Sequence, residues 1–185
     1  IKHTVSAYKS STKLKKRSQS VNKERNLPPT QQTLDLFEEY YNFITQPRGS
    51  NWCLFTCLLN VLVEKGVPSI DALKMLYKAS GDTNGFSLSA DYKAGFIKKL
   101  FSMHGVRPWN LNTIKQCLKK GYFVILIFKG SSQSHACLAR LLDEKVVIFD
   151  PAIRARQPVQ ELTSTDRGYR GYQLSDCIVL VDIVS

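Results

Sequence analysis

Several features are missing from this sequence, and each absence excludes a class of protein. No apolar run approaches the roughly 20 residues of a membrane span, and no signal-peptide-like apolar core opens the chain. There is no CxxC pair, and the five cysteines follow no common zinc spacing. Beyond the N-terminal stretch, His104 and His135 are the only histidines. We therefore expect no membrane span, no metal site and a reducing compartment such as the cytoplasm.

Acidic residues are scarce at the N-terminal end. Residues 1–30 hold eight Lys or Arg and one Glu, a net +7, and the remaining 155 residues carry only +4. The stretch is rich in Ser and Lys, which predicts a flexible tail or linker before a domain over 31–185. Its charge could hold nucleic acid only weakly, because Tyr8 is its single aromatic side chain. The first residue is Ile rather than Met, so we expect a piece of a longer chain.

Helical patterns occupy the first part of the predicted domain. Periodic apolar residues and turn signals predict helices from about Ser50 to Gly66 and over 69–80, 91–105 and 110–121. Ser50, Ser69 and either Asn110 or Asn112 are the expected N-caps. The segment 33–44 reads equally well as a short helix or an extended arm.

Strand patterns follow. A continuous apolar run over 122–128 predicts a strand buried on both faces. Residues 135–142 and 145–150 flank a tight turn and predict a hairpin, and 177–184 predicts a last strand. The stretch 153–173 reads as a solvated loop or as a surface that faces a substrate. Helices before strands indicate an α+β fold, in which a helical half packs against an antiparallel sheet.

Cys53 and Cys57 lie four residues apart in "NWCLFTCLLNVL", hence on one face of the first predicted helix. The pair alone allows a metal site, a disulfide, two core residues or a nucleophile with a packing neighbour. Cys53 falls near the helix start, where free N–H groups and the helix dipole stabilise a thiolate. A plain core thiol is the simpler reading of either cysteine.

A histidine and an aspartate meet in the predicted hairpin. His135 begins one strand and Asp150 ends the next, so antiparallel pairing makes them neighbours. A thiolate nucleophile needs such a base, and the base needs an acceptor that orients it. Asp150 also precedes Pro151, and it could simply cap that turn.

These motifs resemble the papain-like cysteine proteases. The resemblance covers about 46–184 and rests on "NWCLFTCLLNVL" and on "SHACLARLLDEKVVIFDPA". The second motif looks most like bacteriocin-processing peptidases, and the small size looks more like viral enzymes of the picornaviral leader and nidovirus accessory types. The resemblance implies a papain-like α+β fold in which the nucleophile helix packs on a C-terminal antiparallel sheet.

The resemblance also implies roles. Cys53 would attack a peptide or ubiquitin-type isopeptide carbonyl, His135 would act as base and acid, and Asp150 would orient His135. Gln46 or Asn51 would supply the oxyanion-hole donor, although Gln46 could equally be an ordinary polar residue of a loop. We expect a viral protease, excised from a polyprotein in the host cytoplasm, monomeric and without metal or cofactor. Its partners would be protein or polyprotein substrates and ubiquitin-like modifiers.

Two alternatives stay open. The same triad could transfer acyl groups, as in an acyltransferase or a transglutaminase-like enzyme. The chain could also be a non-catalytic, protease-like module that binds a partner through its basic tail and the Arg-rich stretch 153–173.

Overall fold

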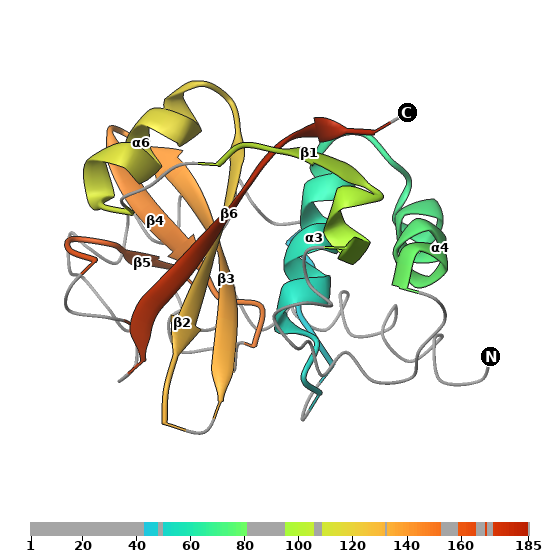
Figure 1. Cartoon of the computed structure of the whole chain (residues 1–185), viewed down its shortest axis with the longest axis horizontal. Helices are drawn as coiled ribbons and strands as arrows, with labels where there is room; N and C mark the ends of the chain where they lie inside the picture. Colours follow the sequence, from blue (N-terminus) through green and yellow to red (C-terminus); the bar gives the residue numbers. More distant parts are fainter. Residues whose placement is uncertain are drawn as a thin grey trace, which may run out of the picture. The chain divides into compact units, whose positions relative to one another are not determined.

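The computed structural model describes residues 43–47, 50–80, 95–105, 109–131, 133–152, 159–165, 169 and 172–184. All of them belong to one compact unit, Asn42–Ser185. The predicted tail over 1–30 and nearly all of 33–44 lie outside the described residues. Helices and an antiparallel sheet make up the described part, which confirms the predicted α+β class (Figure 1).

The helices begin and end largely where the sequence predicts. They are α3 (Cys53–Glu64), α4 (Ser69–Ser80) and α6 (Leu111–Lys119). Gly66 adopts a positive φ of 88° just after α3, which suits a glycine at a helix end. Asn110 caps α6 as predicted, because its side chain accepts the Thr113 N–H while its own N–H donates to the Thr113 hydroxyl.

Two predicted N-caps are wrong. Trp52 holds the cap position of α3 and makes no side-chain capping bond, while the Ser50 hydroxyl donates to Pro47 O at 2.8 Å. The Ser50 side chain is bonded within the turn that precedes the helix. The positive N-terminal end of α3 therefore begins at Cys53 with no side-chain cap. Ser69 is the first residue of α4 rather than its cap, and Pro68 O accepts the N–H groups of the first turn.

The helix predicted over 91–105 is also wrong in its second half. Residues 91–94 lie outside the described part, 95–98 form a helical turn, and Phe101–Met103 form strand β1. Strand β1 pairs with β6, and Phe101 is 2% exposed. Its pairing with a distant strand overrides the local helical pattern.

Six strands form one sheet among the described residues. They are β1, β2 (Phe123–Lys129), β3 (Ser134–Leu142), β4 (Lys145–Phe149), β5 (Val159–Glu161) and β6 (Gln173–Ile183), in the spatial order β1-β6-β2-β3-β4-β5. Every adjacent pair is antiparallel. Strands β2 and β6 and the β3–β4 hairpin confirm the predictions, whereas β5 lies in the stretch read as a loop or a substrate-facing surface.

The sheet is covered on both faces, and this positions the candidate site. Helix α6 packs on one face, over a core that includes Val124, Leu126 and Ile148. Helix α3 contacts β3 and β2 from the other side, with α4 packed behind it (Figure 1). Strand β2 is buried from Val124 to Phe128, as expected of a strand covered on both faces. None of the described helices is long and apolar enough to cross a membrane.

Candidate active site

Three elements bring the predicted nucleophile, base and acceptor together. Cys53 is the first residue of α3, His135 is the second residue of β3, and Asp150 directly follows β4. Strands β3 and β4 pair with Leu138 opposite Phe149, so Asp150 continues this register toward the start of β3. The hairpin therefore puts His135 and Asp150 side by side, as predicted from the sequence.

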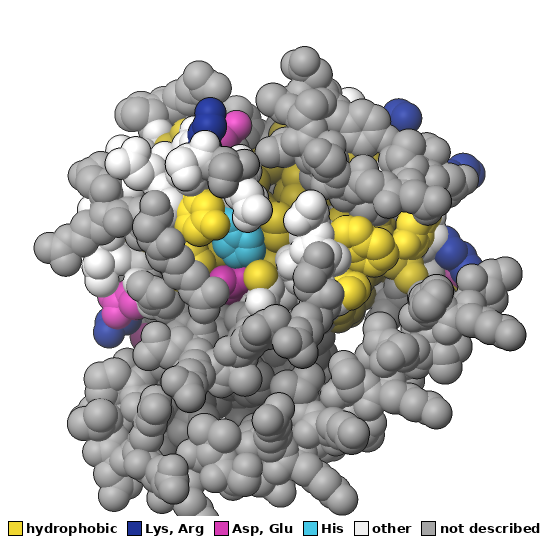
Figure 2. All heavy atoms as spheres, turned by 90° about the horizontal axis from the view of Figure 1, so that it is seen from below, with side chains coloured by type: hydrophobic (Ala, Val, Ile, Leu, Met, Phe, Trp, Pro, Cys, Tyr) yellow, Lys and Arg dark blue, Asp and Glu magenta, His cyan; other side chains and the backbone are white. Residues whose placement is uncertain are grey.

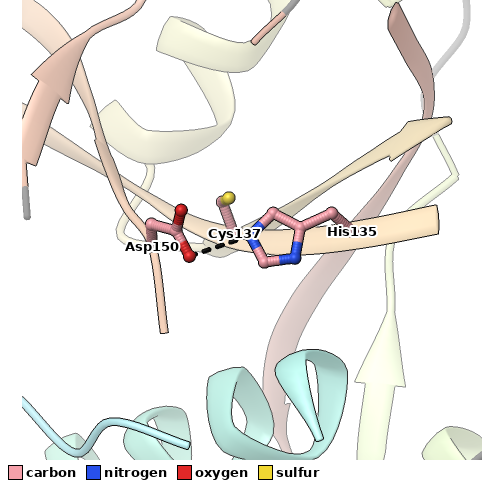
Figure 3. Close-up of side chains that lie close together, drawn as sticks. All are labelled: His135, Cys137 and Asp150. Atoms are coloured by element: carbon pink, nitrogen blue, oxygen red, sulfur yellow. Dashed lines mark hydrogen bonds and ion pairs between the residues drawn. The ribbon is translucent and has the colours of Figure 1, made fainter. Parts of the chain in front are cut away.

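The His135–Asp150 pair is closely bonded. Nε2 of His135 lies 2.8 Å from Oδ1 of Asp150, and the Asp150 side chain has no exposed surface, while the His135 side chain is 16% exposed (Figure 3). The carboxylate accepts two further bonds, from the Ala152 N–H to Oδ1 at 2.7 Å and from the Tyr169 hydroxyl to Oδ2 at 2.8 Å. A buried carboxylate so surrounded by donors remains ionised.

The pKa values of the pair follow from these contacts. Burial lowers the pKa of His135, but the hydrogen bonds to Asp150 and Cys53 and the charge of Asp150 outweigh burial and raise it to about 9. Burial raises the pKa of Asp150, and the hydrogen bond and charge of His135 more than reverse this, which leaves the pKa below its usual value. The pair is therefore an imidazolium–carboxylate pair at neutral pH.

Cys53 completes the arrangement from the helix side. Its half-buried thiol lies within the influence of His135, and since Nε2 is bonded to Asp150, Nδ1 is the ring nitrogen that is left to interact with the sulfur. Burial alone raises the pKa of Cys53, but hydrogen bonds from His135 and the Ala136 N–H, with the charge of His135, bring it below the ordinary value. A lowered pKa enlarges the thiolate fraction at neutral pH.

Cys57 contacts the same strand but in different surroundings. Strand β4 ends at Phe149, so the start of β3 has no strand partner on that side, and α3 lies there instead. The Cys57 thiol, fully buried, donates to Ala136 O at 3.7 Å. Burial, followed by the nearby Cys53 and Asp150, raises the pKa of Cys57 well above its usual value. Cys57 is thus a core thiol that stays protonated.

The remaining three cysteines are core residues. All five cysteines are free thiols, and Cys117, Cys137 and Cys177 are buried. Burial raises the pKa of both Cys117 and Cys177. Cys53 is therefore the cysteine that we expect to react with alkylating reagents near neutral pH.

The two predicted oxyanion donors, Gln46 and Asn51, have different surroundings, and neither is hydrogen-bonded to Cys53. Gln46 Nε2 donates to Ser50 O at 2.8 Å, and its Oε1 is buried without a hydrogen-bond partner among the described residues. Asn51 is exposed, and no hydrogen bond joins it to Cys53. The donor stays undecided between them. At the start of α3, hydrogen bonding from the Leu54 backbone counters the effect of burial and helps to lower the pKa of Cys53.

Asn60 ties the Gln46 segment to the site, a role that the sequence analysis did not assign. Its side-chain amide pairs with the Ile44 backbone: Oδ1 accepts the N–H at 2.7 Å, and Nδ2 donates to the carbonyl at 2.9 Å. Gln46 N–H donates to Pro151 O at 2.9 Å, beside Asp150. Residues 43–47 are thus bound to both α3 and the turn after β4.

Tyr169 and Tyr172 were also missed as site residues. The Tyr169 ring lies nearly parallel to the His135 ring, with centroids 6.5 Å apart and an interplanar angle of 12°, and the Tyr172 ring lies 6.4 Å away. Both come from the stretch that the sequence left as loop or substrate-facing surface. Two tyrosines in a polar segment just before the last strand were the available signal.

The helix side of the site is lined by aromatic rings. Trp52, directly before Cys53, lies 5.5 Å from Phe55 and 6.5 Å from Tyr77 between ring centroids. On the face drawn in Figure 2, a histidine side chain is visible among hydrophobic side chains, with an acidic group beside it. Such surroundings limit water around a thiolate and its base.

One group of side chains could hold a metal ion. Ligand atoms of His135, Cys137 and Asp150 lie within 4.8 Å of one another, on the same face of the hairpin (Figure 3). Cys, His and Asp together suit zinc. In this arrangement, however, Nε2 of His135 and Oδ1 of Asp150 are bonded to each other, so an ion would have to separate them.

Comparison of the chain with known protein families, with curated proteins and with solved structures gave no match in any of the three.

Proposed function

We propose that this chain is a papain-like cysteine protease that uses Cys53 as nucleophile, His135 as acid and base, and Asp150 as orienting carboxylate. The observation that carries the proposal is the convergence of three side chains: the His135 ring is bonded to the buried Asp150 carboxylate at 2.8 Å, and the same ring lowers the pKa of Cys53, the first residue of α3, against the effect of burial. It spans a helix start and a strand hairpin, which is the arrangement that the sequence resemblance implies.

The chemistry follows from the charges. The Cys53 thiolate attacks the substrate carbonyl carbon, and the carbonyl electron pair moves onto oxygen. His135, as imidazolium, gives its proton to the leaving amine as the C–N bond breaks, and a thioester on Cys53 remains. Water then gives a proton to neutral His135 and attacks the thioester, which releases the acid and restores the thiolate and the imidazolium. Asp150 stays ionised and stabilises the imidazolium.

A fluorogenic peptide library tests the proposal. We expect hydrolysis by the intact chain and a loss of at least about 10³-fold with Cys53→Ala, because no other group can form the thioester. His135→Ala should lose at least about 10²-fold, and Asp150→Asn less than His135→Ala, because the amide oxygen still accepts from the ring. A chelator should leave the rate unchanged. Hydrolysis that persists in Cys53→Ala contradicts the proposal, and hydroxylamine-dependent product would indicate acyl transfer instead.

On the sequence resemblance alone, we further propose a viral enzyme acting in the host cytoplasm, with polyprotein and ubiquitin-type substrates. Ubiquitin with a C-terminal fluorophore, assayed beside a peptide with the same last residues, tests the second part. Faster release from ubiquitin than from the peptide supports recognition of the folded modifier, and equal rates contradict it.

One observation favours a second candidate, the non-catalytic binding module. Gln46 Nε2 donates to Ser50 O, so one of the two N–H groups of the predicted oxyanion donor is already engaged by the backbone. If the chain is an inactive module, no peptide of the library should be hydrolysed, although iodoacetamide still alkylates Cys53 readily.

A further inference from the structure

We propose that Tyr169 is a positioning residue of this site: its hydroxyl fixes the Asp150 carboxylate, and its ring fixes the plane of the His135 imidazole. The catalytic part of this inference rests on the proposed function, whereas the effect on Cys53 reactivity can be measured without any substrate.

The two oxygens of Asp150 have separate partners. Oδ1 faces His135 Nε2 and the Ala152 N–H, at 2.8 and 2.7 Å, whereas Oδ2 accepts from the Tyr169 hydroxyl at 2.8 Å. With donors on both oxygens the carboxylate cannot rotate about its Cβ–Cγ bond without losing one of them. Tyr169 therefore keeps Oδ1 aligned with Nε2, and through the ring it keeps Nδ1 facing Cys53.

The ring of Tyr169 adds a second constraint. It lies nearly parallel to the His135 ring at 12° and within 5.4 Å of the Phe128 ring, and Tyr169 is only 3% exposed. An imidazole that contacts this rigid face is restricted in its side-chain rotation. Because Tyr169 is buried, a substrate would touch His135 rather than Tyr169, so its influence must pass through the pair.

Tyr169 is itself held in place through Tyr172, next to the end of β2. Its N–H donates to Tyr172 O at 2.7 Å, and the Tyr172 N–H donates back to Tyr169 O at 2.9 Å. The Tyr172 ring rests on Gly130, where a Cβ atom would come within 2.6 Å of the ring. Gly130 directly follows β2, and β2 pairs with β3. Tyr169 and Tyr172 are therefore held at the end of the sheet that carries His135.

The charge of Asp150 determines the expected direction. A hydroxyl that donates to a carboxylate stabilises its ionised form, so losing it raises the pKa of Asp150. A less firmly held carboxylate orients the imidazolium less well, and the imidazolium then stabilises the Cys53 thiolate less. The described titratable groups that face this pair are Cys53 and Cys57 from α3, Cys137 from β3, and Tyr169 and Tyr172.

Tyr169→Phe and Tyr172→Phe form a matched pair for the test. Both keep an aromatic ring next to His135, but only Tyr169→Phe removes the hydroxyl bonded to Asp150. The rate of Cys53 alkylation by iodoacetamide, followed by mass spectrometry against pH, gives the apparent pKa of the thiol. We expect its midpoint to rise by at least about 0.5 pH unit in Tyr169→Phe and to stay at the wild-type value in Tyr172→Phe.

Catalysis gives a second readout. In Tyr169→Phe we expect kcat to fall by about 10-fold with KM unchanged and the acid limb of the pH–rate profile to move upward. A purely structural role would lower the rate by one factor at every pH. That result, or equal midpoints for the two phenylalanine variants, would overturn the inference.

A second pair of variants tests whether Tyr169 acts through the charge of Asp150. In this pair no buried carboxylate is left without a partner. Asp150→Asn and Asp150→Asn/Tyr169→Phe should have the same alkylation midpoint, because no titrating carboxylate remains. An additional shift in the double variant contradicts the inference. If the midpoints behave as expected but no substrate is hydrolysed, the protease proposal fails and the positioning role stands.

Discussion

Cys53 and Cys57 lie one turn apart on α3 and contact the same residue of β3, yet their thiols have opposite surroundings. Burial raises the pKa of Cys53, but hydrogen bonding to His135 and to the Ala136 backbone, together with the charge of His135, brings it below the ordinary value. Cys57 donates to Ala136 O and is fully buried near Asp150, which keeps it protonated. Helical spacing brings the two to one face, and only the position of His135 separates their roles.

This difference predicts separable effects of mutation. Cys57→Ala should keep most of the hydrolytic rate and lower the free energy of unfolding by about 1–2 kcal/mol, because it removes one sulfur contact and leaves a small void. Cys57→Ser, which retains a donor for Ala136 O, serves as the control. Urea unfolding and peptide hydrolysis measure the two effects. A folded Cys57→Ala that is as inactive as Cys53→Ala would contradict the assignment.

The predictable residues of the site are those linked by local register. His135 and Asp150 follow from one hairpin, because a tight turn between two apolar runs fixes which residues are opposite. Tyr169 could not be predicted in this way, since its contact with Asp150 joins a polar stretch without a strand pattern back to the end of β4. The oxyanion donor is similarly beyond the sequence, because the Gln46 side chain has a competing backbone acceptor nearby.

At the scale of elements, the patterns of α3 and β2 predicted the structure correctly, whereas the helix predicted over 91–105 gave way to strand β1 and the three-residue strand β5 was not predicted. Helix α3 and the buried strand β2 carry their patterns over many residues. Strands β1 and β5 have three residues each, and each has a single strand partner in the sheet. The partner of β1 lies about 80 residues further along the chain, and β5 is only three residues long, so neither strand has a strong local signal.

The contact between α3 and the segment 43–47 can be tested by a substitution of Asn60. Asn60 is 4% exposed and replaces a strand partner for Ile44. Asn60→Ala leaves the half-buried Ile44 backbone groups without these bonds, so we expect a loss of about 1–3 kcal/mol in the free energy of unfolding. We also expect faster cleavage near residues 43–47 in limited proteolysis. Asn51→Ala, at an exposed position, is the control, and equal stability of the two variants would contradict this account.

At the scale of the whole molecule, the basic residues over 1–30 are expected to be dispensable for the chemistry. Their composition cannot form a core, whereas the site is assembled within 43–184. A chain that starts near residue 31 should hydrolyse a small peptide at close to the rate of the full chain and unfold at the same temperature. A large drop in the unfolding temperature would reveal a structural role for the tail.

The site also makes the stability of the whole fold depend on pH. His135 has a folded pKa of about 9, above the 6.5 of the unfolded chain, so its contribution is complete below pH 6.5 and is lost as pH rises through 9. The difference in unfolding free energy between wild type and His135→Ala should therefore be larger at about pH 6 than at about pH 10, by roughly 1 kcal/mol or more. Denaturant titrations at both pH values measure it, and a pH-independent difference contradicts the raised pKa.

The central claim is that His135 holds Cys53 as a reactive thiolate, and one measurement tests it most directly. The rate of iodoacetamide alkylation at each cysteine is followed against pH in wild type and in His135→Ala. We predict that Cys53 reacts rapidly even at about pH 6, well below the pKa of roughly 8.5 that a free thiol has. The four buried cysteines should react slowly at that pH. In His135→Ala the profile of Cys53 should move up toward that of a free thiol. Equal reactivity of all five cysteines, or a profile unchanged by His135→Ala, would contradict the claim.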